Sequence, residues 1–134
     1  MIVRNQQQAA LDSLFKGKAL IIYGPRQAGK TTFSEQLLQI IGKKTLRLNG
    51  DDADTREAFL RPNVTLLERI IGDHEIVFID EAQRIQDIGV VIKIIVDRLK
   101  HVQVIATGSS SFELAGNINE PLTGRRYEMQ LLPI

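Results

Sequence analysis

Runs of consecutive apolar residues alternate along the chain with stretches in which apolar residues recur every three or four positions. The consecutive runs predict short buried strands, and the spaced pattern predicts helices that bury one face. Strands are expected at residues 19–23, 45–48, 76–79, 102–106 and 127–132. Because helical segments separate these strands, the sequence predicts an α/β fold with a parallel sheet and right-handed crossovers.

Polar residues and glycines mark where the predicted helices begin and end. Asn5 and Gln8 have the spacing of a capping box for a first helix, and Gly17 is its expected stop. Asp54 and Glu57 are expected to cap a short helix in the middle of the chain. These signals place helices in the intervals between the strands.

Two further helices are expected in the second half of the chain. Residues 64–71 form one, capped by Asn63 and closed by Gly72. Residues 88–100 form the other, although many of them are β-branched and favour strand. Because the apolar residues of 88–100 go almost all the way round a helix, we expect either heavy burial or an absent partner surface.

The loop after the first predicted strand has the pattern GxxxxGK[ST], in which glycines permit close backbone approach to a phosphate. Its backbone N–H groups and the following helix N-terminus surround a β-phosphate. Lys30 is expected to reach the β- and γ-phosphates, and the Thr31 hydroxyl to bind Mg²⁺. The predicted nucleotide-binding residues are Gly24, Pro25, Arg26, Gln27, Ala28, Gly29, Lys30, Thr31 and Thr32.

An acidic pair, Asp80 and Glu81, ends the strand predicted at 76–79. At the carboxyl end of a parallel strand beside a phosphate loop, Asp80 is expected to hold Mg²⁺ and Glu81 to activate the attacking water. The alternative is that Asp80 caps a helix and Glu81 lies on the surface. Asp51 and Asp52 follow another strand, where they either add to the Mg²⁺ shell or form a turn.

Hydroxyl groups and arginines supply the remaining candidates. Ser109, and after it Thr107, follows a buried run and is expected to contact the γ-phosphate or the water; the alternative is a helix cap. Arg125 is a candidate for neutralising charge on the transferring phosphoryl group, ahead of Arg126. The alternative is that both arginines are merely solvated.

Composition limits the classes of function. The 134 residues suffice for one domain, and 43% hydrophobic with 25% charged residues is ordinary for a globular protein. The chain has no cysteine and two histidines, which argues against a zinc site, and its net charge of +1 gives no global attraction to nucleic acid. No apolar run approaches the roughly 18 residues of a membrane span, so a cytoplasmic location is the default expectation.

Four segments together resemble an AAA-type ATPase family of bacteria and archaea: GPRQAGKTT, IVFIDEAQRI, IATGSSS and LTGRRYEMQLLP. Members of that family usually continue into a C-terminal domain of unknown function. The resemblance covers nearly the whole chain and implies a three-layer α/β/α P-loop fold with five parallel strands in the order 5-1-4-3-2. It also implies that residues 1–134 are the ATPase core of a longer protein, as the abrupt apolar end of the chain suggests.

The resemblance assigns roles to individual residues. Lys30 and Thr31 would belong to the Walker A motif, and Asp80 and Glu81 to Walker B. Ser109 would lie at or near the sensor 1 position, where AAA proteins often have asparagine or threonine. Arg125 would be an arginine finger. The catalytic set implied is therefore Glu81, Lys30, Ser109 and Arg125, with Thr31 and Asp80 as metal ligands and ATP or ADP with Mg²⁺ as cofactors.

Three functions compete. The first is a Mg-ATP hydrolase whose cycle moves an attached domain or a partner. The second is a nucleotide-gated binding module with little turnover, because no segment matches the AAA helical lid and Arg125 is a candidate for acting in trans within a homo-oligomer. The third is a small-molecule kinase, for which no acceptor pocket is recognisable. Nucleic-acid binding stays open.

Overall fold

The computed structural model of the protein describes residues 2–25, 29–109 and 122–131, and for 2–5 the backbone only. Its sheet is built from β1 (Ala19–Tyr23), β2 (Thr45–Asn49), β3 (Ile76–Asp80), β4 (Gln103–Gly108) and β5 (Arg126–Gln130). Its helices are α1 (Ile2–Ser13), α2 (Lys30–Ile41), α3 (Ala53–Ala58), α4 (Val64–Ile71) and α5 (Ile88–Arg98), with a short 3₁₀ helix, η2 (Ala82–Arg84).

The five strands form one parallel sheet in the order β2-β3-β4-β1-β5. This is the predicted order 5-1-4-3-2 read from the other side, so that prediction is confirmed. Leu20 of β1 lies opposite Ile105 of β4 on one side and Tyr127 of β5 on the other. β1 therefore lies between β4 and β5, and the end of β4 lies next to the segment that follows β1.

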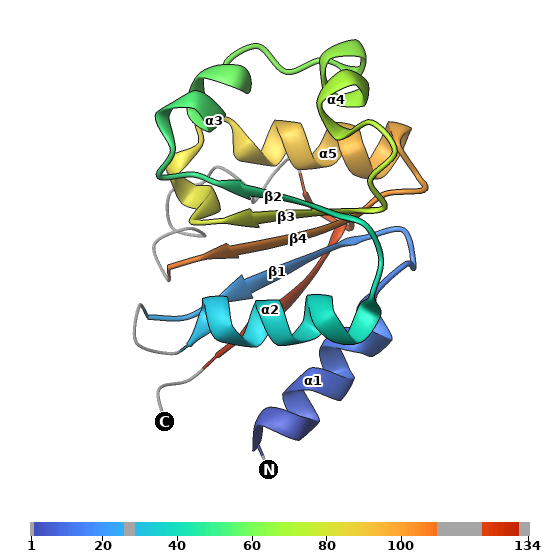
Figure 1. The fold of residues 1–134 in the computed structure, drawn as a ribbon, viewed down its shortest axis with the longest axis vertical. Helices are drawn as coiled ribbons and strands as arrows, with labels where there is room; N and C mark the ends of the chain where they lie inside the picture. Colours follow the sequence, from blue (N-terminus) through green and yellow to red (C-terminus); the bar gives the residue numbers. More distant parts are fainter. Residues whose placement is uncertain (1, 26–28, 110–121, 132–134) are drawn as a thin grey trace.

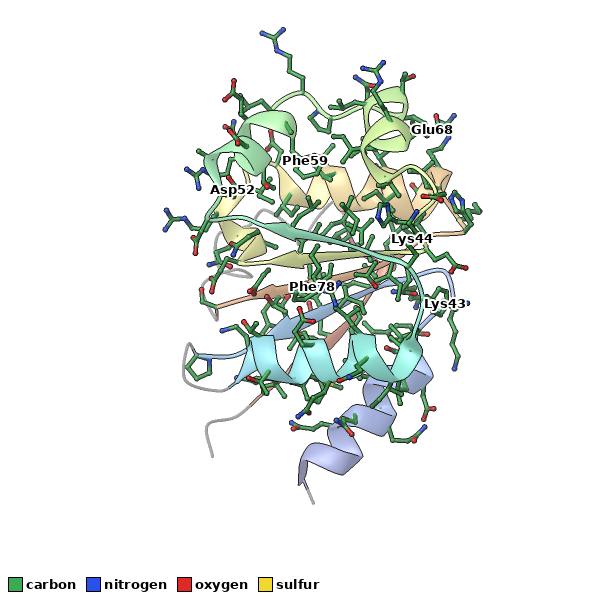
Figure 2. The ribbon with its side chains drawn as sticks, in the orientation of Figure 1. Lys43, Lys44, Asp52, Phe59, Glu68 and Phe78 are labelled. Atoms are coloured by element: carbon green, nitrogen blue, oxygen red, sulfur yellow. The ribbon has the colours of Figure 1, made fainter. Side chains whose placement is uncertain are left out.

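Helices cover both faces of the sheet and make three layers (Figure 1). α1 and α2 lie on one face, where Phe33 and Leu37 pack with Phe78 of β3. α3, α4 and α5 lie on the other face, and Phe59, after α3, packs there with Ile92. Figure 2 shows Phe59 and Phe78 on opposite sides of the sheet. The central strands are buried on both faces, as expected for a parallel sheet covered by helices.

The structure corrects two predicted helix starts. α1 begins at Ile2, so Asn5 lies inside the helix and the capping box predicted for Asn5 and Gln8 is wrong. The side chain that caps α3 belongs to Asp52, which accepts from the Asp54 backbone N–H at 3.1 Å, so the cap assigned to Asp54 is wrong too. Asp52 lies two residues before Asp54 and has the extended backbone conformation that an N-cap residue usually adopts.

The helices of the second half agree closely with the sequence. Asn63 caps α4 by accepting from the Leu66 backbone N–H at 2.9 Å, and Gly72 is the C-cap that follows the last helical residue, Ile71. α5 ends two residues before the predicted limit of 100 and buries most of its apolar residues against the sheet, while Val90 is 38% exposed. Heavy burial is thus the observed outcome for this helix. Within the described ranges, no helix is long and apolar enough to cross a membrane.

Candidate phosphate- and metal-binding site

Lys30, Thr31, Asp80 and Glu81, four of the predicted site residues, lie at the carboxyl edge formed by the central strands β1, β3 and β4 (Figure 1). Gly24, directly after β1, donates its backbone N–H to the carbonyl of Gly108 at the end of β4, over 3.3 Å. α2 then leaves from the same edge, beginning at Lys30. Arg26, Gln27 and Ala28 lie outside the described residues. The strand–loop–helix arrangement that the phosphate-loop pattern requires is present.

Lys30 lies at the centre of this turn and is only 4% exposed. Its ammonium group donates to the carbonyl of Gly24 at 2.7 Å and of Pro25 at 3.2 Å. Gly29 precedes it with φ of 77°, a left-handed conformation that favours glycine. The carbonyls of Gly24 and Pro25 therefore hold the Lys30 ammonium group near the N-terminus of α2, where the helix dipole also favours an anion.

Asp80, the last residue of β3, is held through both carboxylate oxygens. The Thr31 hydroxyl donates to its Oδ2 at 3.1 Å. Its Oδ1 accepts from the hydroxyl of Thr107 on β4 and, at 3.1 Å, from the backbone N–H of Glu81. Thr107 is fully buried. Three elements thus converge on one carboxylate, which fixes the distance between the start of α2 and the end of β3.

The backbone of Glu81 is held equally firmly. Its φ is 49°, in the left-handed region that non-glycine residues seldom occupy. Its carbonyl accepts from the Arg84 N–H at 3.1 Å, and a Cβ added to Gly50 would lie 2.0 Å from that carbonyl oxygen. Gly50 also donates its own N–H to the carbonyl of Asp80 at 2.8 Å. Only a glycine fits beside the turn that carries Glu81.

Gly50 and Gln83 are the two contributors that the sequence analysis missed. Gly50 directly follows β2, and a glycine close to a strand is a recognisable signal of close backbone approach. Gln83 donates from Nε2 to Glu81 Oε1 at 2.7 Å. No sequence signal distinguished it from an ordinary surface glutamine.

Of the two hydroxyls at the end of β4, Thr107 reaches the acidic pair. Ser109, which the sequence analysis placed first, directly follows the strand and is partly buried. β3 and β4 pair with Ile79 opposite Ala106, so the next positions in this register are Asp80 and Thr107, whereas Ser109 lies beyond the end of β4. Thr107 therefore joins the candidate site, and the role of Ser109 stays a prediction.

Asp51 and Asp52 belong to the turn after β2. Asp52 caps α3, and Asp51 lies 3.6 Å from the guanidinium of Arg84. The Asp51 backbone N–H donates to the side chain of Asn49 at 2.9 Å. These contacts match the turn interpretation of the pair.

Arg125 lies at the opposite edge of the sheet from the phosphate loop. It directly precedes β5, and its carbonyl accepts from the N–H of Ala19 at the start of β1. Its Nε donates to Asp97, near the end of α5, at 2.9 Å. The side-chain hydrogen bond and the charge of Asp97 raise the pKa of Arg125, and those of Arg125 lower the pKa of Asp97. The structure does not bring Arg125 to the phosphate loop of its own chain.

Arg126, the weaker of the two arginine candidates, pairs with Glu128 on its own strand at 2.6 Å. It lies at the same edge as Arg125, because it is the first residue of β5.

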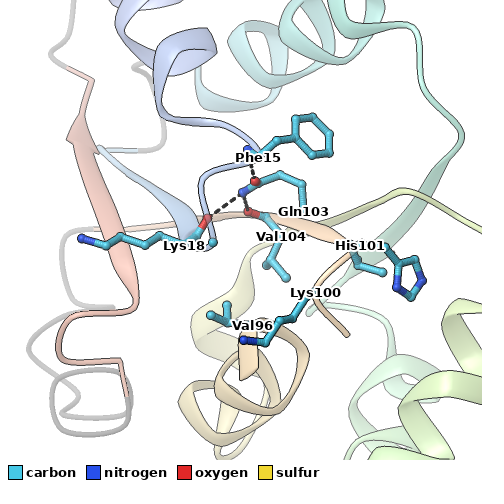
Figure 3. A pocket seen from close by; sticks show the side chains of 9 residues that line it. Phe15, Lys18, Val96, Lys100, His101, Gln103 and Val104 are labelled. Carbon is cyan, nitrogen blue, oxygen red and sulfur yellow. Dashed lines mark hydrogen bonds between the residues drawn. The ribbon is translucent and has the colours of Figure 1, made fainter. Parts of the chain in front are cut away.

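A small cavity of about 140 Å³ also opens at this far edge, lined by Phe15, Lys18, Val96, Lys100, His101 and Gln103 among others (Figure 3). The buried Gln103 side chain accepts from the Phe15 N–H at 2.6 Å. Its amide donates to the carbonyls of Lys18 and Val104 at 2.9 and 2.8 Å. The hydrogen bonds of Gln103 thus connect the segment before β1 to β4, and the cavity lies between these two parts of the chain.

The oxygen donors at the carboxyl edge fit Mg²⁺. Thr31 and Asp80 offer a hydroxyl and a carboxylate 3.1 Å apart, and Mg²⁺ commonly takes one or two protein oxygens together with substrate phosphates and water. Groups of three or more histidine, cysteine or acidic residues able to hold a metal are absent from the described parts of the chain. A small, water-rich magnesium site shared with a phosphate is what this donor set can build.

Comparison with known proteins supports this assignment. A family model for an AAA domain matches residues 16–134. Two uncharacterized proteins, Mb2031c of Mycobacterium bovis and Rv2008c of Mycobacterium tuberculosis, are each 32% identical over 128 residues. The match covers 93% of this chain and 28% of each relative, so the chain spans little more than a quarter of their length.

Solved structures share the fold. The Pif1 helicase from Candida albicans superposes with a TM-score of 0.62 at 13% identity, covering 97% of this chain and 40% of that one. Thermotoga maritima RuvB R170A gives 0.63 at 16% identity, covering 97% and 43%. At these identities the likeness concerns the fold alone. The family match over 16–134 and the phosphate-loop geometry together show that the chain belongs to the AAA domain family of P-loop ATPases.

Proposed function

We propose that this domain binds ATP with Mg²⁺ and hydrolyses it, and that the cycle moves a further domain or a partner. The proposal is supported above all by the Thr31–Asp80 hydrogen bond next to a buried Lys30, because an ammonium group, a hydroxyl and a carboxylate then lie at the same edge of the sheet. Lys30 would hold the β- and γ-phosphates, and Thr31 and Asp80 would hold Mg²⁺. The metal would neutralise charge on the phosphate oxygens.

Glu81 is the proposed residue that orients and deprotonates the attacking water. Its backbone is fixed by Asp80, Thr107 and Arg84, so its carboxylate leaves the end of β3 in a defined direction. The left-handed turn that sets this direction costs free energy, and such strain is typical of functional positions.

The test combines binding and turnover. Calorimetry with Mg-ATP should detect binding to the wild-type domain and to Glu81→Gln, and little or none to Lys30→Met. Phosphate release should be abolished by Glu81→Gln, while Glu68→Gln, on the exposed face of α4 (Figure 2), should match wild type. Binding of no nucleotide by folded wild-type protein would refute the proposal.

A second function, a nucleotide-gated binding module with little turnover, is favoured by one observation. Arg125 lies at the edge opposite the phosphate loop, where it pairs with Asp97, so it does not reach the nucleotide site proposed in its own chain. An arginine finger contributes about 10³ to 10⁵ in rate, so a domain lacking one in place would turn over slowly. Specific activity that rises with protein concentration and is lost in Arg125→Ala favours this function. Fast turnover independent of concentration favours the hydrolase acting alone.

A further inference from the structure

We propose that Gln83 is a positioning residue that holds the carboxylate of Glu81 for its work on water. This inference rests on the proposed hydrolysis and assigns a role to a side chain outside the phosphate loop and the acidic pair. Gln83 lies in η2, the single 3₁₀ turn that follows Glu81, and its Nε2 donates to Glu81 Oε1 at 2.7 Å. A hydrogen bond to a carboxylate is stronger than one between neutral groups.

The bond acts on the only part of Glu81 that the backbone leaves free. The Glu81 N–H and carbonyl are already engaged by Asp80, Thr107 and Arg84. What remains mobile is the rotation of the side chain about its own bonds. By holding Oε1, Gln83 restricts that rotation and leaves Oε2 as the oxygen available to a water.

A second observation separates this role from ordinary structural packing. Gln83 Oε1 is buried and has no hydrogen-bond partner among the described residues. A buried unsatisfied acceptor costs about 1–3 kcal/mol. Turning the amide over would not help, because its oxygen would then face the Glu81 carboxylate. The Gln83 amide is therefore oriented by Glu81, at a cost in stability that a purely structural residue would avoid.

The hydrogen bond between Glu81 and Gln83 does not cap the 3₁₀ helix η2. Glu81 occupies the N-cap position of η2, yet its side chain makes no capping hydrogen bond to the described backbone. The Glu81 carboxylate is directed to Gln83 instead. The contact serves the orientation of the carboxylate rather than the end of the 3₁₀ turn.

The test uses Gln83→Met, which keeps the length of the side chain and removes both its donor and its unpaired acceptor. We expect kcat for phosphate release to fall on the order of 10-fold to 100-fold, as for a misplaced catalytic group. The Kd for Mg-ATP should stay within about twofold of the wild-type value. The melting temperature should be unchanged or higher, because the substitution removes the buried Gln83 Oε1 that has no hydrogen-bond partner among the described residues. Gln86→Met, an exposed glutamine four residues from η2's start, is the matched control and should match wild type.

Wild type and Glu81→Gln are measured first, so that failure of hydrolysis itself is recognised separately. If wild type turns over and Gln83→Met is equally active, or loses activity only in proportion to lost stability, the inference is wrong while the proposed function stands. A readout without turnover is the side-chain amide signal of Gln83 in an NMR spectrum of ¹⁵N-labelled protein. It should shift in Glu81→Gln and not in Glu68→Gln; an unmoved signal would also overturn the inference.

Discussion

Thr31 Oγ1 and Asp80 Oδ2 lie 3.1 Å apart although the two residues are 49 positions apart in the chain. One comes from the first turn of α2 and the other from the last position of β3. α2 follows β1, and β4 lies between β1 and β3 in the sheet, where its Thr107 donates to the other oxygen of the same carboxylate. The candidate metal site is thus a product of strand order.

Thr107→Val should weaken the site more than Ser109→Ala does. Valine keeps the shape of threonine and removes the hydroxyl that Asp80 Oδ1 accepts from, so Asp80 loses one of the groups that orient it. We expect the free energy of unfolding to fall by about 1 kcal/mol and the Mg²⁺-dependent part of nucleotide binding to weaken. Calorimetry of ATP binding with and without Mg²⁺ measures this; a larger effect from Ser109→Ala would restore serine as the leading residue.

Gly50→Ala should both destabilise the domain and impair turnover. The added Cβ would lie 2.0 Å from the Glu81 carbonyl oxygen, which is backbone and cannot rotate away. We expect a loss of about 3 kcal/mol from overpacking, with displacement of the Glu81 turn.

Gly17→Ala is the control, because Gly17 has φ of 81° but open space around its Cβ position. Strain alone should cost it about 1 kcal/mol, without any effect on turnover. Urea unfolding and phosphate release are measured on both variants. Equal stability losses would show that the Gly50 contact relaxes at little cost.

Asp97→Asn should lower stability in a pH-dependent way. The Arg125 hydrogen bond, with the charges of Arg125, Lys93 and Lys100, holds the pKa of Asp97 below its ordinary value of 3.8. A carboxyl whose pKa is depressed by folding stabilises the protein above the unfolded pKa, and that contribution is lost as the pH falls through the folded pKa.

The wild-type domain should therefore be more stable than Asp97→Asn at pH 7, and the two curves should converge as the pH falls from about 5 toward about 2. The effect should be small and weakened by salt, since Arg125 and Asp97 are 34% and 36% exposed. Thermal melts across this pH range measure it. A constant difference at every pH would show that packing, not the ion pair, is responsible.

The fold could be predicted from the sequence because its elements are signalled locally. β1 and α4 have the predicted limits, since each is a short apolar run or a stripe bounded by glycine or asparagine. The start of α1 could not be predicted, because the helix begins at Ile2 and the capping pattern of Asn5 and Gln8 lies inside it. Propensity alone also could not decide between Asp52 and Asp54 as the cap of α3, because either aspartate suits that position.

The site shows the same division. Lys30, Thr31 and Asp80 were predictable because the phosphate loop and the acidic strand end are patterns with a chemical reason. The contacts that depend on strand register and on close backbone approach could not be predicted from the sequence. Thr107 rather than Ser109 faces Asp80, and Gln83 meets Glu81 only because of the left-handed turn between β3 and η2. Such contacts are decided by three-dimensional placement.

If Arg125 acts as the proposed arginine finger, its placement limits how copies of this domain can assemble. The phosphate loop and Arg125 are separated by the length of a five-residue strand, about 16 Å at 3.3 Å per residue. An arginine from one copy can therefore approach the nucleotide of another only through contact between unlike surfaces, the amino end of one sheet facing the carboxyl end of the next. Head-to-tail contacts of that kind close into rings or continue as filaments. A two-fold dimer formed through either surface alone would leave both nucleotides without the arginine.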